Sequence, residues 1–366
     1  MNEQMKSEYS PFIITADSHS PKDLSRWLAH HPQVKKIDHY QDQLRELFEI
    51  TNPFLVRNQA KLQEFLADNK EQDQIIGVWV YYPWRNAIVH LLTEHDFFAL
   101  RTNRNQKLIS AKEQLQLRDF PIAIFGMSIG GVIAKTIIQC GFSQRMTICD
   151  DDYFSISNLN RVPVDIFAIG QSKAERVAQD LYQLDPFLKL NVIRKRATQT
   201  LIEKLMREKN RPQLLIDAID DFPMKVLLRQ MAKKYRLPLL MCTNLGDSVL
   251  FDVERYDLES LQPFHGRVKA ALLNKIVNQK LSDDERKMLA VTLVGKNNVP
   301  LRAKRSVTQL GITLVGRPQL YSSVTVGAGI TAFLVRQIAL RKKVVSQQTK
   351  IHFPSIFDLE DMMEVN

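Results

Sequence analysis

The sequence predicts an α/β fold with a mostly parallel sheet, and three observations lead to this prediction. Near the middle of the chain, at residues 121–161, a glycine-rich turn links an apolar, β-branched run to an apolar helix. Apolar strands and helices then alternate up to residue 256, which is typical of a sheet covered by helices on both faces. Several of these strands end in carboxylates, and ligands of such sheets bind beyond the carboxyl ends of the strands.

The segment 121–161 carries the clearest pattern. In order, it holds a strand at 121–125, the glycines Gly126, Gly130 and Gly131, a helix at 132–140, a strand at 146–149 and then Asp150, Asp151 and Asp152. This order indicates the first βαβ unit of a Rossmann-like, doubly wound fold that binds a nucleotide. The dinucleotide pattern G-x-G-x-x-G would place a glycine at Ser128, so a purely structural turn stays open as an alternative.

Further strands and helices follow this unit. We expect strands at 190–194, 214–217, 238–242 and 249–256, and helices at 174–184, 200–208 and 223–235. Because the strands alternate with helices, the sheet is expected to stay mostly parallel. One of these strands ends in Asp217, with Asp220 and Asp221 just beyond it.

Other regions complete the expected domain organisation. Residues 1–100 combine short apolar strands with helical segments, so we expect an N-terminal α+β region there. Residues 101–345 form the main domain, which a charged, helical insertion interrupts at 257–315. The last part of this insertion, residues 297–307, is interpreted only as a polar, basic stretch. Long insertions of this kind are usually functional or bind a partner. Residues 346–366 are expected to form a C-terminal tail.

Charge and composition argue against several classes of protein. The 366 residues include 50 Lys and Arg against 40 Asp and Glu, a formal net charge of +10. The basic residues are spread along the chain without interleaved aromatic residues, so we expect no nucleic-acid partner. The polar start and the interrupted apolar run at 324–340 favour a cytoplasmic protein without a membrane span. Cys140, Cys149 and Cys242 form no CxxC pair, so neither disulfides nor zinc are expected.

Five segments, taken together, resemble one superfamily. They are, in order, the turn Gly126–Gly131, the acidic run Asp150–Asp152, the S-N-L-N-R segment Ser157–Arg161, the G-Q-S-K segment Gly170–Lys173 and the D-A-I-D segment Asp217–Asp220. Their order and spacing are similar to those of the ThiF, MoeB and ubiquitin-activating superfamily of adenylating enzymes. The resemblance covers roughly residues 100–256 and, less fully, 316–341. It includes neither the CxxC zinc motifs of that superfamily nor a cysteine in the crossover loop.

The resemblance implies ATP-dependent adenylation, in which a substrate carboxylate attacks the α-phosphate of ATP and pyrophosphate leaves. Asp220, helped by Asp152, would hold Mg²⁺, because this ion prefers carboxylate and phosphate oxygens. Lys173 and Arg161 would contact the phosphates. Arg104, in an Arg-x-x-Arg segment before the glycine turn, would act as an arginine finger, which in this family often serves the other subunit of a dimer.

The remaining implied contacts are with the nucleotide. Asp150 would bind the ribose hydroxyls, and Asn158 would bridge a phosphate or a metal-bound water. The other expected nucleotide contacts are Gly126, Ser128, Ile129, Gly131, Asn160 and Asp221. The cofactors expected from the resemblance are therefore ATP and Mg²⁺, without zinc.

The acyl substrate and two rival functions stay open at this point. The substrate carboxylate could be the C-terminus of a ubiquitin-like or sulfur-carrier protein, or that of a peptide. In the second case the chain would resemble the peptide-modifying enzymes of natural-product maturation, and residues 1–100 would recognise the peptide. A NAD-binding oxidoreductase is one alternative, but the S-N-L-N-R segment and Lys173 would have no role in it. The other is an inactive nucleotide-binding module, which Ser128 and Ile129 suggest because the turn of the superfamily has glycines at these two positions.

Overall fold

A computed structural model describes residues 9–69, 75–278, 281–295 and 298–359. The chain divides into two compact units, each with its own sheet. The first unit comprises residues 1–114 with 178–188, and the second comprises residues 115–177 with 189–366.

The first unit contains a four-stranded sheet in the order β1-β3-β4-β2. Its strands are β1 (Phe12–Ile14), β2 (Lys35–Asp38), β3 (Val78–Tyr82) and β4 (Ala87–Leu91). Its helices are α1 (Pro21–His30), α2 (Tyr40–Thr51), α3 (Gln59–Asp68) and α4 (Glu94–Thr102). His90 in β4 stacks between Tyr40 and Trp79, with ring centroids 4.2 Å from each. This histidine is thus a packed strand residue.

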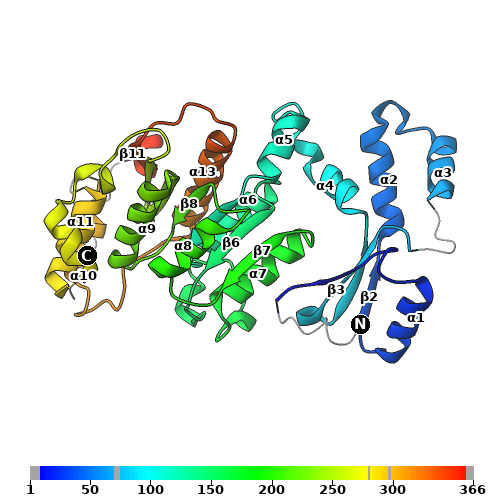
Figure 1. Ribbon diagram of the computed structural model, residues 1–366, viewed down its shortest axis with the longest axis horizontal. Coiled ribbons are helices and arrows are strands. Elements are labelled where there is room, and N and C mark those ends of the chain that lie inside the picture. The colour runs from blue at the N-terminus through cyan, green and yellow to red at the C-terminus, as the bar shows by residue number, and fades with distance from the viewer. Residues whose placement is uncertain (1–8, 70–74, 279–280, 296–297, 360–366) are drawn as a thin grey trace. The chain divides into compact units, whose positions relative to one another are not determined.

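The second unit contains a seven-stranded sheet in the order β11-β10-β9-β8-β5-β6-β7 (Figure 1). Its strands are β5 (Ile122–Phe125), β6 (Arg145–Cys149), β7 (Lys189–Ile193), β8 (Leu214–Asp217), β9 (Pro238–Asn244), β10 (Ser248–Arg255) and β11 (Gln347–His352). The five strands from β7 to β9 are parallel, whereas β10 and β11 pair antiparallel. The expected doubly wound, mostly parallel sheet is confirmed.

Helices cover both faces of this sheet because its strands are apolar on both sides. The helices are α5 (Ala111–Arg118), which begins in the first unit, α6 (Ile129–Gln139), α7 (Lys173–Leu184), which ends in the first unit, α8 (Gln199–Arg207), α9 (Phe222–Tyr235) and α13 (Tyr321–Ala339). Side chains of Ala123, Phe125 and Leu215 form one core with α8 and α9. On the opposite face, α6 packs on Ile124 and α13 packs on α6, β9 and β10.

Helix α13 is the one described helix whose length and hydropathy would allow it to cross a membrane. Half of it is buried inside the protein. Gly327 explains this close packing, since a Cβ at this position would lie 2.6 Å from the Sγ of Cys242 in β9. The glycine-containing helix is therefore a core helix.

The region at 257–315 is helical, as predicted. It contains the 3₁₀ turn Pro263–Gly266, α10 (Ala270–Asn278), α11 (Asp283–Val294) and α12 (Leu301–Thr308). Helix α12 is formed by the stretch that we had interpreted only as polar and basic, because it has no apolar stripe long enough to indicate a helix.

The expected C-terminal tail is corrected by the structure. Residues 347–352 form β11, which pairs antiparallel with β10 from Ser248↔His352 to Val253↔Gln347 and so belongs to the main sheet. A short helix, α14 (Phe353–Ile356), follows it. The sequence Q-Q-T-K-I-H hides this strand, because an edge strand with mostly exposed side chains needs few apolar residues.

Candidate active site

The glycine turn follows β5 and owes its shape to close contact with the neighbouring strand. Gly126 has φ +91°, and a Cβ there would lie 2.4 Å from the carbonyl oxygen of Ala218. Gly131 serves helix packing instead, since its Cβ would lie 2.9 Å from a methyl group of Val177 in α7. The turn therefore places the first residue of α6, Ile129, directly beyond the end of β5.

Ser128 precedes α6 at the N-cap position but makes no capping hydrogen bond with its side chain. The N–H groups of the first helical turn point out of the N-terminus, where the helix dipole favours an anion. The hydroxyl group of Ser128 therefore does not cap the N-terminus of α6.

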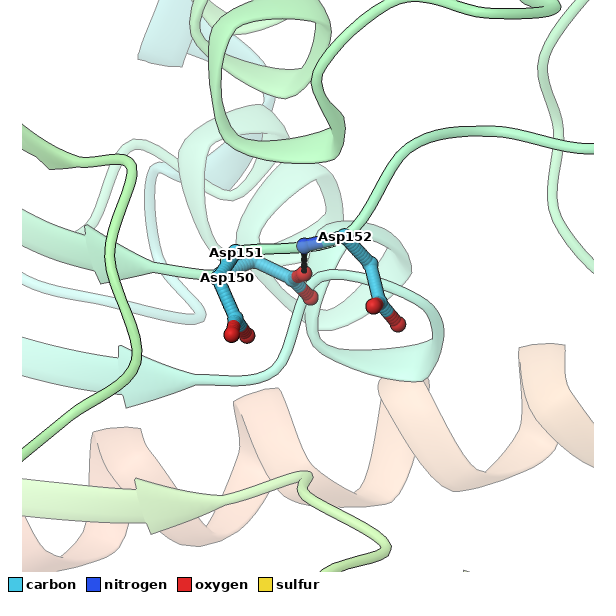
Figure 2. A group of neighbouring side chains, drawn as sticks. All are labelled: Asp150, Asp151 and Asp152. Atoms are coloured by element: carbon cyan, nitrogen blue, oxygen red, sulfur yellow. Dashed lines mark hydrogen bonds between the residues drawn. The ribbon is translucent and has the colours of Figure 1, made fainter.

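Asp150 ties the end of β6 to the glycine turn. Its Oδ2 accepts a hydrogen bond from the Met127 amide (2.5 Å), and its Oδ1 accepts one from the Asp152 amide (2.7 Å), the bond drawn in Figure 2. Burial raises the pKa of Asp150, although these amides and Lys173 oppose the shift. Each oxygen of the carboxylate retains a further lone pair, so Asp150 holds the turn and still has acceptor capacity.

Lys173, the first residue of α7, is anchored beside this turn. Its side chain is only 9% exposed, and its Nζ lies 2.8 Å from an oxygen of Asp152. The Asp152 side chain is 71% exposed. The buried ammonium group of Lys173 is therefore paired with a carboxylate at the surface. Ligand oxygens of Asp150, Asp151 and Asp152 lie within 4.8 Å of one another.

The D-A-I-D segment divides into a buried and an exposed carboxylate. Asp217 is fully buried and pairs with Lys225 (3.0 Å) and Arg229 (2.7 Å) of α9. Asp220 is 79% exposed and pairs with Arg317 (2.5 Å). Asp217 braces the end of β8, whereas Asp220 faces solvent with a carboxylate that a cation can reach.

Asp221 has a structural position. It is the N-cap of α9, where it accepts a hydrogen bond from the Met224 amide (3.1 Å), and it also pairs with Arg196. Its expected contact with the nucleotide would compete with both interactions.

A cavity of about 310 Å³ lies at the carboxyl ends of β5, β6 and β8. We call it the first cavity. Of the expected site residues, its walls include Gly126, Ser128, Asp150, Asp152, Lys173, Asp220 and Asp221. Lys195 and Arg196 also line it, and sequence reasoning missed them. The sequence does contain a feature that could have identified these two residues, because the basic run 194–196 directly follows strand β7.

The S-N-L-N-R segment does not line the first cavity. Asn158 is buried and accepts a hydrogen bond from the Ser155 amide (3.2 Å) through its Oδ1. Asn160 donates from its Nδ2 to the carbonyl oxygen of Gln319 (3.0 Å). Arg161 donates to the carbonyl oxygen of Ser157 (2.6 Å) and to Oδ1 of Asn160. Most of these hydrogen bonds join residues of the loop to one another. The expected nucleotide contacts of the segment stay predictions.

A second cavity of about 540 Å³ adjoins the first. Ser128, Ala218, Ile219 and Asp220 line both. Of the expected site residues, Ile129 and Arg161 line only the second cavity. The N-terminus of α6 and the exposed carboxylate of Asp220 therefore lie where the two cavities meet.

Arg104 lies in the first unit, on the 3₁₀ turn Asn103–Asn105, with an exposed side chain. Its expected role as an arginine finger stays a prediction. Cys242 is buried in β9, and burial raises the pKa of its thiol to about 12. A thiol held neutral in this way is a poor nucleophile, and Cys242 packs in the core.

A network of buried charged side chains links β8, α9 and β10 in the second unit. Arg229 has no exposed surface and contacts both Asp217 and Glu254, its Nε lying 2.7 Å from Oε2 of Glu254. Its guanidinium also lies 3.8 Å from the ring centroid of Phe264. His265 pairs with Asp252, another fully buried carboxylate. Phe264 and His265 both have positive φ, so these contacts hold a strained turn.

The comparison with protein families agrees with this geometry. The model of the ThiF family matches residues 100–252. The uncharacterized protein MT1398 of Mycobacterium tuberculosis is 30% identical over 353 residues, which are 95% of this chain and 46% of that protein. The chain therefore spans about half the length of this curated relative.

Two solved Escherichia coli structures illustrate the structural likeness. One is tRNA N6-threonylcarbamoyladenosine dehydratase, TcdA, in complex with ATP, with 16% identity, 66% of this chain and 95% of that chain covered, and a TM-score of 0.47. The other is MccB with MccA-N7isoAsn, with 12% identity, 66% and 63% covered, and a TM-score of 0.45. At these scores, neither likeness supports a conclusion by itself.

The matched residues 100–252 contain the glycine turn, the acidic ends of β6 and β8, the S-N-L-N-R segment and Lys173. They therefore include all five segments on which the resemblance was based. Residues 100–252 therefore form a region that matches the model of the ThiF family.

Proposed function

We propose that this ThiF-family domain is an ATP-dependent adenylyltransferase that activates a carboxylate as an acyl-adenylate and releases pyrophosphate. The observation that carries the proposal is the composition of the first cavity. One wall offers the N-terminus of α6, another offers Lys173, and the carboxylates of Asp152 and Asp220 face the same space. Sites that combine cationic groups, a helix N-terminus and carboxylates suit a nucleoside triphosphate with its metal ion.

The residues present fit a divalent cation such as Mg²⁺. Asp152 and Asp220 both line the first cavity, and both have largely exposed carboxylates that can act as ligands. When bound there, Mg²⁺ would neutralise charge on the phosphate oxygens. Arg317 donates to Oδ1 of Asp220, which leaves Oδ2 available as a ligand.

The chain's own residues would position the reacting groups. Lys173, held by Asp152, presents a fixed ammonium group to the phosphates, and Asp150 fixes the glycine turn through the Met127 amide. A carboxylate that enters from the second cavity meets the first cavity at Ser128 and Asp220. Its oxygen would form a bond to the α-phosphorus, and the bond to the β-phosphate would break with its electron pair leaving on pyrophosphate. Positioning and charge neutralisation dominate such phosphoryl chemistry.

The finer parts of the proposal concern partners. The acyl substrate would be a ubiquitin-like carrier or a peptide that presents its C-terminal carboxylate. Arg104 would stabilise the charge that develops at the phosphorus, as a residue supplied to the partner of a cytoplasmic homodimer. The exposed side chain of Arg104 is compatible with this role.

One observation favours a second candidate, a nucleotide-binding module that does not adenylate. The ion pair between Asp220 and Arg317 neutralises the carboxylate that would hold the metal, and Ser128 and Ile129 stand where the family has glycines. Such a module would bind ATP but would not exchange pyrophosphate into it. A NAD-binding oxidoreductase, in contrast, would bind NAD in preference to ATP.

The test is substrate-dependent exchange of labelled pyrophosphate into ATP by the full chain. We expect Asp220→Ala to abolish the exchange without changing the thermal unfolding. The matched control is Asp119→Ala, which removes an exposed carboxylate that pairs with Arg118 outside both cavities. Full exchange by the Asp220 variant would refute the assignment, and ATP binding without exchange by the wild type would favour the inactive module.

A further inference from the structure

The second cavity is larger than the one proposed for the nucleotide, and much of its wall comes from the helical insertion. Its apolar lining includes Ala290 and Leu293 of α11, Val307 of α12 and Leu310 after α12. Phe222 of α9 and Met241 of β9 also line it. A volume of about 540 Å³ is within the range of pockets that hold drug-sized ligands. The cavity thus offers a continuous apolar wall beside the reaction site.

Cationic side chains surround this apolar wall. Arg161, Arg286 and Arg317 line the cavity, as does Lys225, and Asp220 is the carboxylate among the lining residues. Lys225 is 9% exposed and donates to Asp217 (3.0 Å) and, more weakly, to the Sδ of Met241 (3.4 Å). The charge of the cavity therefore favours an anion, and its walls favour an apolar body.

A buried amide in the lining has unused hydrogen-bonding capacity. Asn244, at the end of β9, is 8% exposed, and within the described part of the chain its Oδ1 has no hydrogen-bond partner. The oxygen and nitrogen of an Asn amide are assigned from their hydrogen-bond partners. The unpartnered end of Asn244 is therefore equally consistent with an acceptor or a donor. Unpaired polar atoms in a buried position cost stability, and a bound polar ligand removes that cost. Asn244 lines the second cavity, and its Oδ1 lies near Gly327 of α13.

We infer that the second cavity binds the acid to be activated, and that this acid carries an apolar body directly next to its carboxylate. The inference rests on the proposed adenylation, because it identifies the acyl substrate of the same site. A Gly-Gly tail has no side chains to cover the apolar wall, which would then stay in contact with water. A phenyl or branched aliphatic group covers that wall while the carboxylate reaches Ser128 and Asp220 at the junction of the cavities. The shared chemistry is thus an apolar carboxylate, supplied as a free acid or as the last residue of a peptide.

The first experiment measures binding without any turnover, using naphthylacetic acid as a fluorescent probe with the full chain. We expect saturable binding to the wild type, and at least about tenfold weaker binding of the uncharged naphthylacetamide. Ala290→Trp fills the cavity from α11 and is expected to weaken the probe at least about tenfold, whereas ATP affinity stays within about twofold. Met288→Trp, on an exposed position of the same helix, is the matched control and leaves probe binding unchanged.

Arg286→Gln is a second variant that adds no bulk. It removes an exposed cation from the lining and is expected to weaken the probe about threefold or more. Equal probe binding by wild type, Ala290→Trp and Arg286→Gln would overturn the inference, as would no probe binding to a wild type that binds ATP. A wild type that binds the probe but not ATP would instead refute the proposed adenylation and leave the cavity assignment supported.

The second experiment compares acids in pyrophosphate exchange. Naphthylacetic acid and the peptide Ala-Ala-Phe are expected to support exchange at least about tenfold faster than Ala-Gly-Gly at equal concentration. The faster of the first two identifies the source, a free acid or a peptide. Equal or faster exchange with Ala-Gly-Gly would overturn the inference while confirming adenylation itself.

Discussion

Replacing Asp217 and Asp220 one at a time by asparagine separates structure from chemistry within a single D-A-I-D segment. Asp217 has no exposed surface and accepts from Arg229 (2.7 Å), Lys225 (3.0 Å) and the Ile219 amide (3.2 Å). Burial alone would raise the pKa of Asp217, but Lys225 and Arg229 hold it below its ordinary value. The carboxylate is therefore charged in the folded protein, and the substitution Asp217→Asn would leave two buried cations with less compensation.

The size of the effect follows from what remains after the substitution. Removing one partner of a buried ion pair costs about 3–5 kcal/mol. Arg229 keeps Glu254 as a partner, so the lower end, about 3 kcal/mol, applies to Asp217→Asn. For a unit of this size that loss lowers Tm by about 6–12 °C. Asp220→Asn removes an exposed ion pair and should cost less than about 1 kcal/mol.

Urea unfolding measured by two signals provides the assay and its internal control. All three tryptophans, Trp27, Trp79 and Trp84, lie in the first unit, whereas far-UV circular dichroism reports on both units. We expect Asp217→Asn to shift the transition seen by circular dichroism more than the tryptophan transition. A loss below about 1 kcal/mol for Asp217→Asn, or an equal loss for Asp220→Asn, would refute the reasoning.

Three further predictions concern the glycine turn, the half-buried His265 and the arginine finger. Gly126→Ala should cost about 2 kcal/mol or more in urea unfolding, because its φ is positive and its Cβ would meet a carbonyl oxygen; an unchanged midpoint would contradict this. For His265, burial lowers the pKa, but Asp252 and Glu254 raise it above its ordinary value near 6.5. The stabilisation from protonated His265 is thus complete below that value and is lost as pH rises through the folded-state pKa. The free energy of unfolding of the wild type should therefore fall above about pH 6.5. The variant His265→Asn, whose side chain tolerates positive φ, should not show this fall. Arg104→Ala should lower kcat about 10³-fold or more with little change in ATP affinity, and unchanged turnover would remove Arg104 from the reaction.

The core of the fold could be predicted from the sequence because its elements are locally encoded. The β5–α6–β6 unit has β-branched strands, a glycine turn and helical spacing within about 30 residues, and each feature indicates the same structure. Strand β11 could not be predicted, because an antiparallel edge strand is specified by its pairing with β10 rather than by its own apolar residues. Helix α12 was missed for a similar reason, since its eight residues are mostly basic and polar.

The candidate site was predictable in its residue types but less so in its contacts. The carboxylates, Lys173 and the glycine turn were identified and do line one cavity. The sequence could not show that Asp217 is buried and Asp220 exposed, because this depends on the packing of α9 against β8. The pairing of Arg229 with Glu254 joins residues 25 positions apart in sequence, and such pairs are set by tertiary structure.

The most direct measurement of adenylation is the identity of the products formed from ATP labelled at the α-phosphate. The full chain is incubated with Mg²⁺ and with naphthylacetic acid, Ala-Ala-Phe or Ala-Gly-Gly, and the nucleotides are separated. We expect the α-label in an acyl-adenylate and in the AMP that its hydrolysis by water releases, with their sum equal to the pyrophosphate formed. These products should form only when an acid is present and should be lost in Asp220→Asn. ADP and phosphate as the products, or AMP formation that persists in Asp220→Asn, would contradict the proposed chemistry.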